Sequence, residues 1–164
     1  MDLDTNMGLV GLLADMPTMD AKYLVGIVSR TFHITGALML GGSFFYLKSV
    51  LGPAGADACF ADRRKVFARW VHVAITLLLA SGIYNFIAIS GAAKASGSPL
   101  PAAYHALFGI KFLVGLLLMF VASLVSGRSS AAERARTNIE KWLGIGWSAT
   151  LAIVVLGAIL RSLH

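Results

Sequence analysis

Residues 23–50 read YLVGIVSRTFHITGALMLGGSFFYLKSV, and this stretch decides the fold. It contains no acidic residue and is long enough for a transmembrane helix, which needs roughly 20 apolar residues. Gly36, Gly41 and Gly42 are small side chains of the kind that let membrane helices approach closely. The stretch therefore predicts a membrane-spanning helix that packs against neighbouring helices.

Three further stretches of similar character follow at residues 67–92, 103–126 and 142–163. Of the 164 residues, 57% are hydrophobic and only 13% are charged, and the mean hydropathy is +0.77. A soluble domain has about half apolar and a quarter charged residues. Because the connections are short, residues 23–164 predict an all-α polytopic membrane protein, an antiparallel up-down four-helix transmembrane bundle.

Residues 1–22 are predicted to form an outer N-terminal segment. Residues 7–16 within it are apolar but too short to span, so they predict an interfacial helix. The connection after the first span begins at Gly52-Pro53, and the connection after the third span is polar and is expected to extend a helix inward. Cys59 is the single cysteine, which excludes an intrachain disulfide.

The basic residues are distributed unevenly between the predicted loops. The N-terminal segment, second connection and C-terminus hold only Lys22, Lys94 and Arg161. The first and third connections hold Arg63, Arg64, Lys65, Arg69, Arg128, Arg134, Arg136 and Lys141. Because positive loops stay cytoplasmic, both termini are predicted outside, in a bacterial inner membrane. This use of the basic residues also argues against nucleic-acid binding despite the net charge of +6.

Polar side chains gather at one predicted depth of the outer half of the bundle. With a rise of about 1.5 Å per residue, Arg30, His33, Asn85 and Lys111 all lie roughly 10–15 Å from the outer ends of three helices. Tyr104 shares a helix face with Lys111. Cations inside a membrane normally have a partner or a function, and no acidic residue of the spans is available to neutralise these.

Haem accounts for this layer well, because a helical bundle is a common haem site and neutral imidazole a common axial ligand. His33 is the first predicted ligand. Lys111 is the second if its amine is neutral, the form that burial favours. Arg30 is placed to pair with a propionate, and His105 becomes a ligand only if the site is shallower. His72 lies roughly 15 Å deeper and cannot share one iron with His33.

Copper binding and a purely structural role are the alternatives to haem. Copper(I) suits imidazole and thioether ligands, which His33, Met39, Met119 and the Met16/Met19 pair offer, although methionines also fill gaps in packing. In a structural role, the polar residues hydrogen-bond between helices, or the chain is an accessory subunit of a larger respiratory or photosynthetic complex.

Three short motifs add a family resemblance. The third span contains YHALFGIKF at residues 104–112, which resembles the Tyr-Gly-x-Leu-Leu-x-x-Lys-Leu segment of the CopD-like copper-resistance membrane domain. SGIYN at residues 81–85 resembles the Thr-Gly-Leu-Tyr-Asn end of that family's preceding helix. His33 followed by Gly41-Gly42 resembles its His-then-Trp-x-Gly-Gly pattern. The resemblance covers about three of the four predicted helices.

The resemblance implies copper movement across the inner membrane. The CopD-like family is similar in turn to the HemJ family, four-helix proteins linked to protoporphyrinogen oxidation that bind haem b through a histidine and a lysine. Carried over by position, these ligands are His33 and Lys111. We therefore expect a b-type haem protein acting in electron transfer or in oxidation of a hydrophobic reductant. Its expected partners are the lipid bilayer, a redox protein or larger membrane complex, and a second copy in a homo-oligomer.

Overall fold

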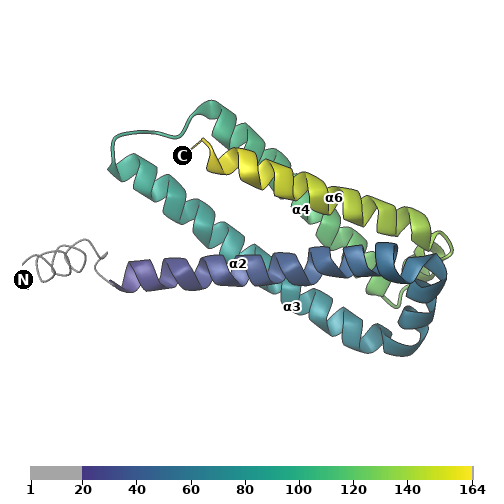
Figure 1. The fold of residues 1–164 in the computed structure, drawn as a ribbon. Coiled ribbons are helices and arrows are strands. Elements are labelled where there is room, and N and C mark those ends of the chain that lie inside the picture. The colour runs from purple at the N-terminus through teal and green to yellow at the C-terminus, as the bar shows by residue number, and fades with distance from the viewer. Residues whose placement is uncertain (1–19, 164) are drawn as a thin grey trace, which may run out of the picture.

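The computed structural model describes residues 20–163, and this part of the chain is helical without a strand (Figure 1). Its elements are α2 (Ala21–Phe45), the π-helix η1 (Tyr46–Leu51), α3 (Gly52–Ala95), α4 (Ala102–Ser126), α5 (Ser130–Arg136) and α6 (Ile139–Arg161). The predicted interfacial helix at residues 7–16 and the Met16/Met19 pair lie outside the described residues.

Three helical stretches of this part are long and apolar enough to cross a membrane: Ala21–Ala95, Ala102–Ser126 and Ile139–Arg161. The first comprises α2, η1 and α3 without a break, so it contains both of the first two predicted spans. The prediction of an all-α chain with helices of membrane-spanning length is confirmed.

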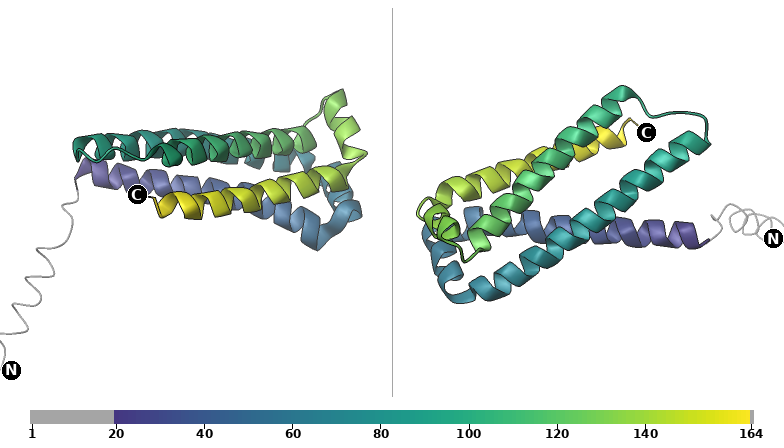
Figure 2. Two further views of the ribbon diagram at one scale, coloured as in Figure 1. Left: turned by 90° about the horizontal axis from the view of Figure 1, so that it is seen from above. Right: turned by 180° about the vertical axis from the view of Figure 1, so that it is seen from behind.

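The connection expected to follow Gly52-Pro53 is helical instead. Gly52 has a positive φ of 67°, which reverses the chain with little strain for glycine. Pro53 then stands in the first turn of α3, where its missing N–H costs nothing. Ala56 and Phe60 are fully buried, so this start of α3 is packed rather than loose. It runs across one end of the molecule before α3 turns back (Figures 1 and 2).

The connection after α4 also differs from the expected inward extension of a helix. The chain breaks at Gly127 and begins a separate short helix, α5, at Ser130. The Ser129 hydroxyl accepts a hydrogen bond from the Ala132 N–H at 3.2 Å and caps this helix. A serine at this position satisfies a backbone donor that the first turn leaves without a partner.

Helices α2 and α3 cross at small residues. A Cβ on Gly36 would lie 2.9 Å from Cγ of Leu78 and 3.0 Å from the backbone oxygen of Ala74. The Ser29 hydroxyl donates to the Ser81 carbonyl at 3.3 Å beside this crossing. Glycine at position 36 therefore sets how closely the two helices approach, and Figure 1 shows that they cross.

Helices α2 and α6 form a second close contact, and they run antiparallel. A Cβ on Gly41 would lie 2.7 Å from the Thr150 methyl group, and one on Gly146 would overlap the Phe44 ring. Viewed from above, α2 and α6 form one layer, and α4 with the later part of α3 forms the other (Figure 2).

The buried apolar core lies toward one end of the molecule. Its members within the described residues come from four segments, residues 40–47, 56–74, 118–125 and 139–149. These segments adjoin the turn from α2 to α3 and the short helix α5. The other half of the molecule, which holds the predicted polar layer, contributes no residue to this cluster.

The two ends of the molecule also differ in charge. The start of α3 and helix α5 lie at the same end (Figure 1), and together with the adjoining Arg128 and Lys141 they carry eight of the 14 lysine and arginine residues. The start of α2, the link between α3 and α4 and the end of α6 lie at the opposite end. We name the first the basic end. The loops grouped by charge in the sequence are therefore also grouped in space.

Arg136 joins α5 to the end of α4. Its Nη1 donates to the backbone oxygens of Val125 at 3.1 Å and Gly127 at 2.9 Å. These carbonyls have no helical partner because α4 ends at Ser126, so the guanidinium acts as a C-terminal cap.

We expect Arg136→Met to lower the free energy of unfolding by about 1–2 kcal/mol, because it removes charged hydrogen bonds to backbone carbonyls. Arg134→Met is the matched control, since exposed Arg134 contacts only the Ser130 carbonyl of its own helix, at 3.4 Å. Thermal unfolding in detergent, followed by circular dichroism, measures both. Equal midpoints for the two variants would contradict the capping role.

Candidate functional site

His33 lies at the crossing of α2 and α3 and is half-buried. Its Nδ1 is 3.0 Å from the hydroxyl oxygen of Ser81, which is itself buried. The Ser81 hydroxyl donates its proton to the carbonyl of Leu77 one turn earlier in α3. With its proton directed to Leu77, the serine oxygen can accept a hydrogen bond from Nδ1 of the imidazole, in the tautomer that carries the proton on that nitrogen.

This arrangement favours one tautomer of the imidazole. A neutral imidazole with its proton on Nδ1 has a lone pair on Nε2, which is the form that ligates metals. Ligating histidines usually donate their other ring nitrogen to an oxygen, which also orients the ring. Gly82 adjoins the same ring: a Cβ there would lie 3.4 Å from Cε1. His33 is thus held as a histidine ligand would be.

Lys111 reaches the same region from α4. It is half-buried and lies within electrostatic range of His33. Its amine adjoins α6, since a Cβ built on Gly157 would lie 3.4 Å from Nζ. Helix α3 thus adjoins His33 at Gly82, and helix α6 adjoins Lys111 at Gly157. The two residues that the sequence grouped by depth lie within electrostatic range of each other.

The other predicted members of the layer are placed differently. Arg30 is exposed on α2, and within the described residues it makes no hydrogen bond or ion pair. Asn85 is half-buried on α3. Tyr104 is buried, with 3% of its surface exposed, two turns before Lys111 on α4. The structure thus places Lys111 within electrostatic range of His33, whereas the Arg30 side chain is exposed on the surface of α2.

His105 belongs to an aromatic cluster between α3 and α4 that the sequence interpretation missed. The rings of Phe86 and Phe108 stack with centroids 4.2 Å apart. His105 is exposed, and its ring meets Phe86 edge-on at 6.4 Å and Tyr104 at 5.9 Å. The available sequence signal was an aromatic residue near the outer end of each of two predicted spans. His105 is thus part of this aromatic cluster, and no hydrogen bond among the described residues joins it to His33.

His72 lies apart from this site. It is exposed on α3, and its Nδ1 donates to the Ala68 carbonyl of the same helix at 2.6 Å. No hydrogen bond in the described part of the chain links it to His33, and it serves below as a control.

The number of possible metal ligands near His33 differs in its suitability for a bare metal ion and for haem iron. The described residues contain no group of three or more His, Cys, Asp and Glu side chains arranged for a metal ion. A bare zinc ion generally takes three or four protein ligands. Haem iron needs only one or two axial ligands from the protein, since the macrocycle supplies the others. The imidazole of His33 and the amine of Lys111 would be enough for this smaller requirement.

Comparisons with protein-family models, with curated proteins and with solved structures found no match to this chain. The resemblance to the CopD-like and HemJ families therefore stays a prediction.

We expect Ser81→Ala to weaken ligation by His33, because the imidazole would lose the oxygen that fixes its proton on Nδ1. Loss of such a supporting contact typically lowers affinity 10- to 100-fold. Haem titration of the purified protein, followed by absorbance, measures this effect. Ser90→Ala on the same helix is the control, since its hydroxyl has no hydrogen-bond partner within the described residues. An unchanged dissociation constant for Ser81→Ala would contradict the orienting role.

Proposed function

We propose that this chain is a bacterial inner-membrane protein with four transmembrane helices and both termini outside. In this proposal it binds one b-type haem between His33 and Lys111. Its work is electron transfer or the oxidation of a hydrophobic reductant that arrives from the bilayer. The proposed spans are α2, the later part of α3, α4 and α6.

The observation that carries the proposal is the hydrogen bond from His33 Nδ1 to Ser81. It supports ligation because it leaves the Nε2 lone pair available and fixes the ring against α3. The Ser81 hydroxyl in turn donates to the Leu77 carbonyl, so two successive hydrogen bonds connect the imidazole to the backbone of α3.

Lys111 supplies the second nitrogen in this proposal. Its amine lies near Gly157 and within electrostatic range of His33. The four apolar stretches identified in the sequence contain no acidic residue that could neutralise it. In this proposal the half-buried Lys111 ligates as the neutral amine. Exposed Arg30 lies one turn outward from His33 and could meet an anionic propionate at the edge of the site.

A haem would supply the one-electron chemistry. Its reduction potential would depend on its two nitrogen ligands and on the exclusion of water from the site. The protein would orient these nitrogens and exclude water. The stacked rings of Phe86 and Phe108 between α3 and α4 support the second role.

Metal analysis of the purified chain separates this proposal from its rivals. We expect about one iron per chain and a pyridine haemochrome spectrum of haem b. Iron and haem content should stay the same when Met16 and Met19 are both replaced by leucine. Copper that disappears in that double variant would instead support the copper-transport alternative. A preparation from haem-replete cells with neither metal would support the accessory-subunit alternative.

A further inference from the structure

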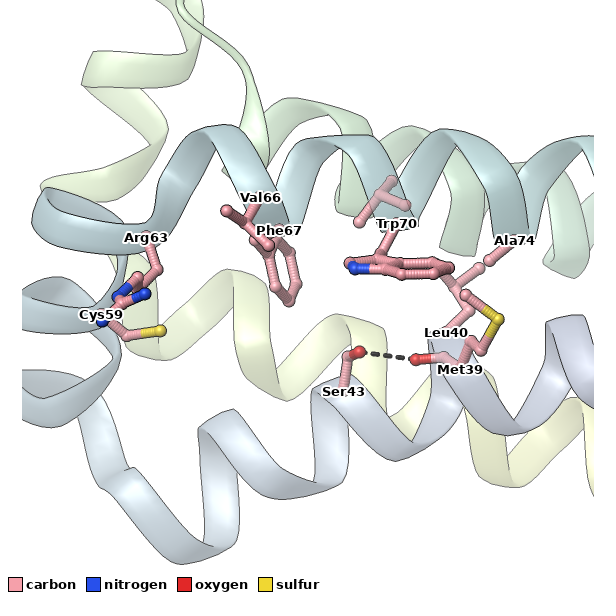
Figure 3. Close-up of a pocket in the computed structure, with 10 residues that line it drawn as sticks. Met39, Leu40, Ser43, Cys59, Arg63, Val66, Phe67, Trp70 and Ala74 are labelled. Carbon is pink, nitrogen blue, oxygen red and sulfur yellow. Dashed lines mark hydrogen bonds between the residues drawn. The ribbon is translucent and has the colours of Figure 1, made fainter.

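A groove separates α2 from the first half of α3, between their crossing and the basic end (Figure 3). Its volume is about 610 Å³, within the range of small-molecule sites. Met39, Leu40 and Ser43 line it from α2, and residues between Cys59 and Ala74 line it from α3. None of the predicted haem-site residues lines this groove.

The groove is apolar along its length and charged at one end. Phe67, Trp70 and Val71 form much of its α3 wall, opposite Leu40. Among the described residues, Arg63 is the only charged one that lines it, and it lies with Cys59 at the end away from Trp70 (Figure 3). This combination suits a molecule with a long apolar body and one anionic group.

The charge around Arg63 strengthens this match. Arg63 begins the run Arg63-Arg64-Lys65, and Arg69 follows six residues after Arg63. Such a juxtamembrane cluster attracts anionic lipid headgroups. Nε of Arg63 forms an ion pair with Oδ2 of Asp62 at 2.9 Å. The side chains of Arg63 and Asp62 are 74% and 77% exposed, respectively. A pair this exposed is weak, and the terminal guanidinium nitrogens can still bind a phosphate in two-point fashion.

We infer that this groove binds an anionic phospholipid, with an acyl chain along the apolar walls and the phosphate at the Arg63 guanidinium. Trp70 is 55% exposed at the groove, where an indole ring would contact the acyl chain. The inference depends on a membrane location but not on haem, so the two proposals can fail separately.

Quenching of Trp70 fluorescence tests this inference directly. Trp142 and Trp147 are replaced by phenylalanine in the full-length chain, which leaves Trp70 as the only tryptophan. Phosphatidylglycerol with brominated acyl chains is then added to the protein in detergent. We expect saturable quenching that unlabelled phosphatidylglycerol reverses, whereas phosphatidylcholine with the same chains does not.

Two charge variants locate the headgroup. Arg63→Gln should weaken the quenching affinity by tenfold or more, because it removes a charged hydrogen bond to phosphate. Arg69→Gln removes the same charge from the same helix but does not line this groove. It should weaken the affinity by no more than about fivefold, the general effect of one basic residue near an anionic surface.

A third variant fills the apolar part. Ser43→Phe leaves every charge in place and should abolish saturable quenching, provided that circular dichroism shows the helical content of the parent. Equal losses in Arg63→Gln and Arg69→Gln would overturn the inference, since the effect would then be non-specific. Equal quenching by brominated phosphatidylcholine would also overturn the inference, because the groove would then bind a neutral lipid. If a neutral quinone alone displaced the brominated lipid, the inference would be overturned in favour of a quinone site.

Discussion

His33→Ala is expected to leave the purified protein with less than about a tenth of the wild-type haem content. Within the described residues, alanine removes the only imidazole that is held against α3 by a buried hydroxyl. Losing a supporting contact of a ligand already costs 10- to 100-fold in affinity, so losing the ligand itself should cost more. Pyridine haemochrome absorbance per mole of protein measures the loss.

The chain offers two matched controls for this variant. His72→Ala removes an exposed imidazole that hydrogen-bonds only its own helix, and His105→Ala removes one from the aromatic cluster. Both should retain wild-type haem content. If His33→Ala kept its haem while either control lost it, the ligand assignment would be wrong and the site would have to be moved.

Gly146→Leu is expected to have the largest effect on stability, lowering the free energy of unfolding by about 3 kcal/mol. Even a Cβ at this position would overlap the ring of Phe44, which is buried with 4% exposed. The added side chain would force α2 and α6 apart where they pack most closely. Thermal unfolding in detergent measures the change, and the emission of adjacent Trp147 reports the local separation.

Gly115→Leu is the control for this substitution. It places the same side chain in the middle of α4, where a Cβ on Gly115 would meet nothing within 4 Å. Its unfolding midpoint should stay close to that of the wild type. Equal loss of stability in both variants would show that the penalty comes from leucine itself and not from the contact between α2 and α6.

Much of the fold could be predicted from the sequence, because apolar length and loop charge are properties of the residues themselves. The helical start of α3 could not. Gly52-Pro53 is typical of a chain break, yet the same pair also suits a reversal followed by the first turn of a helix. Only the burial of Ala56 and Phe60 decides between these outcomes, and burial depends on the rest of the fold.

The candidate site could be predicted only unevenly. Helical rise indicates the common depth of His33 and Lys111, but it says nothing about which way a side chain faces. Arg30 is three residues from His33, a rotation of about 60° around the helix, which is enough to turn it outward. Ser81 is typical of a small packing residue, since the sequence carries no sign that its hydroxyl reaches an imidazole 48 positions away.

The central claim is tested most directly by the absorption spectra of the detergent-purified wild-type protein and its Lys111→Met variant. We predict a Soret band and sharp reduced α and β bands for the wild type, as for a six-coordinate b-type haem. Lys111→Met should keep its haem but show a spectrum with altered axial ligation. A colourless wild-type protein from haem-replete cells would contradict the haem itself, and identical spectra for the two proteins would contradict ligation by Lys111.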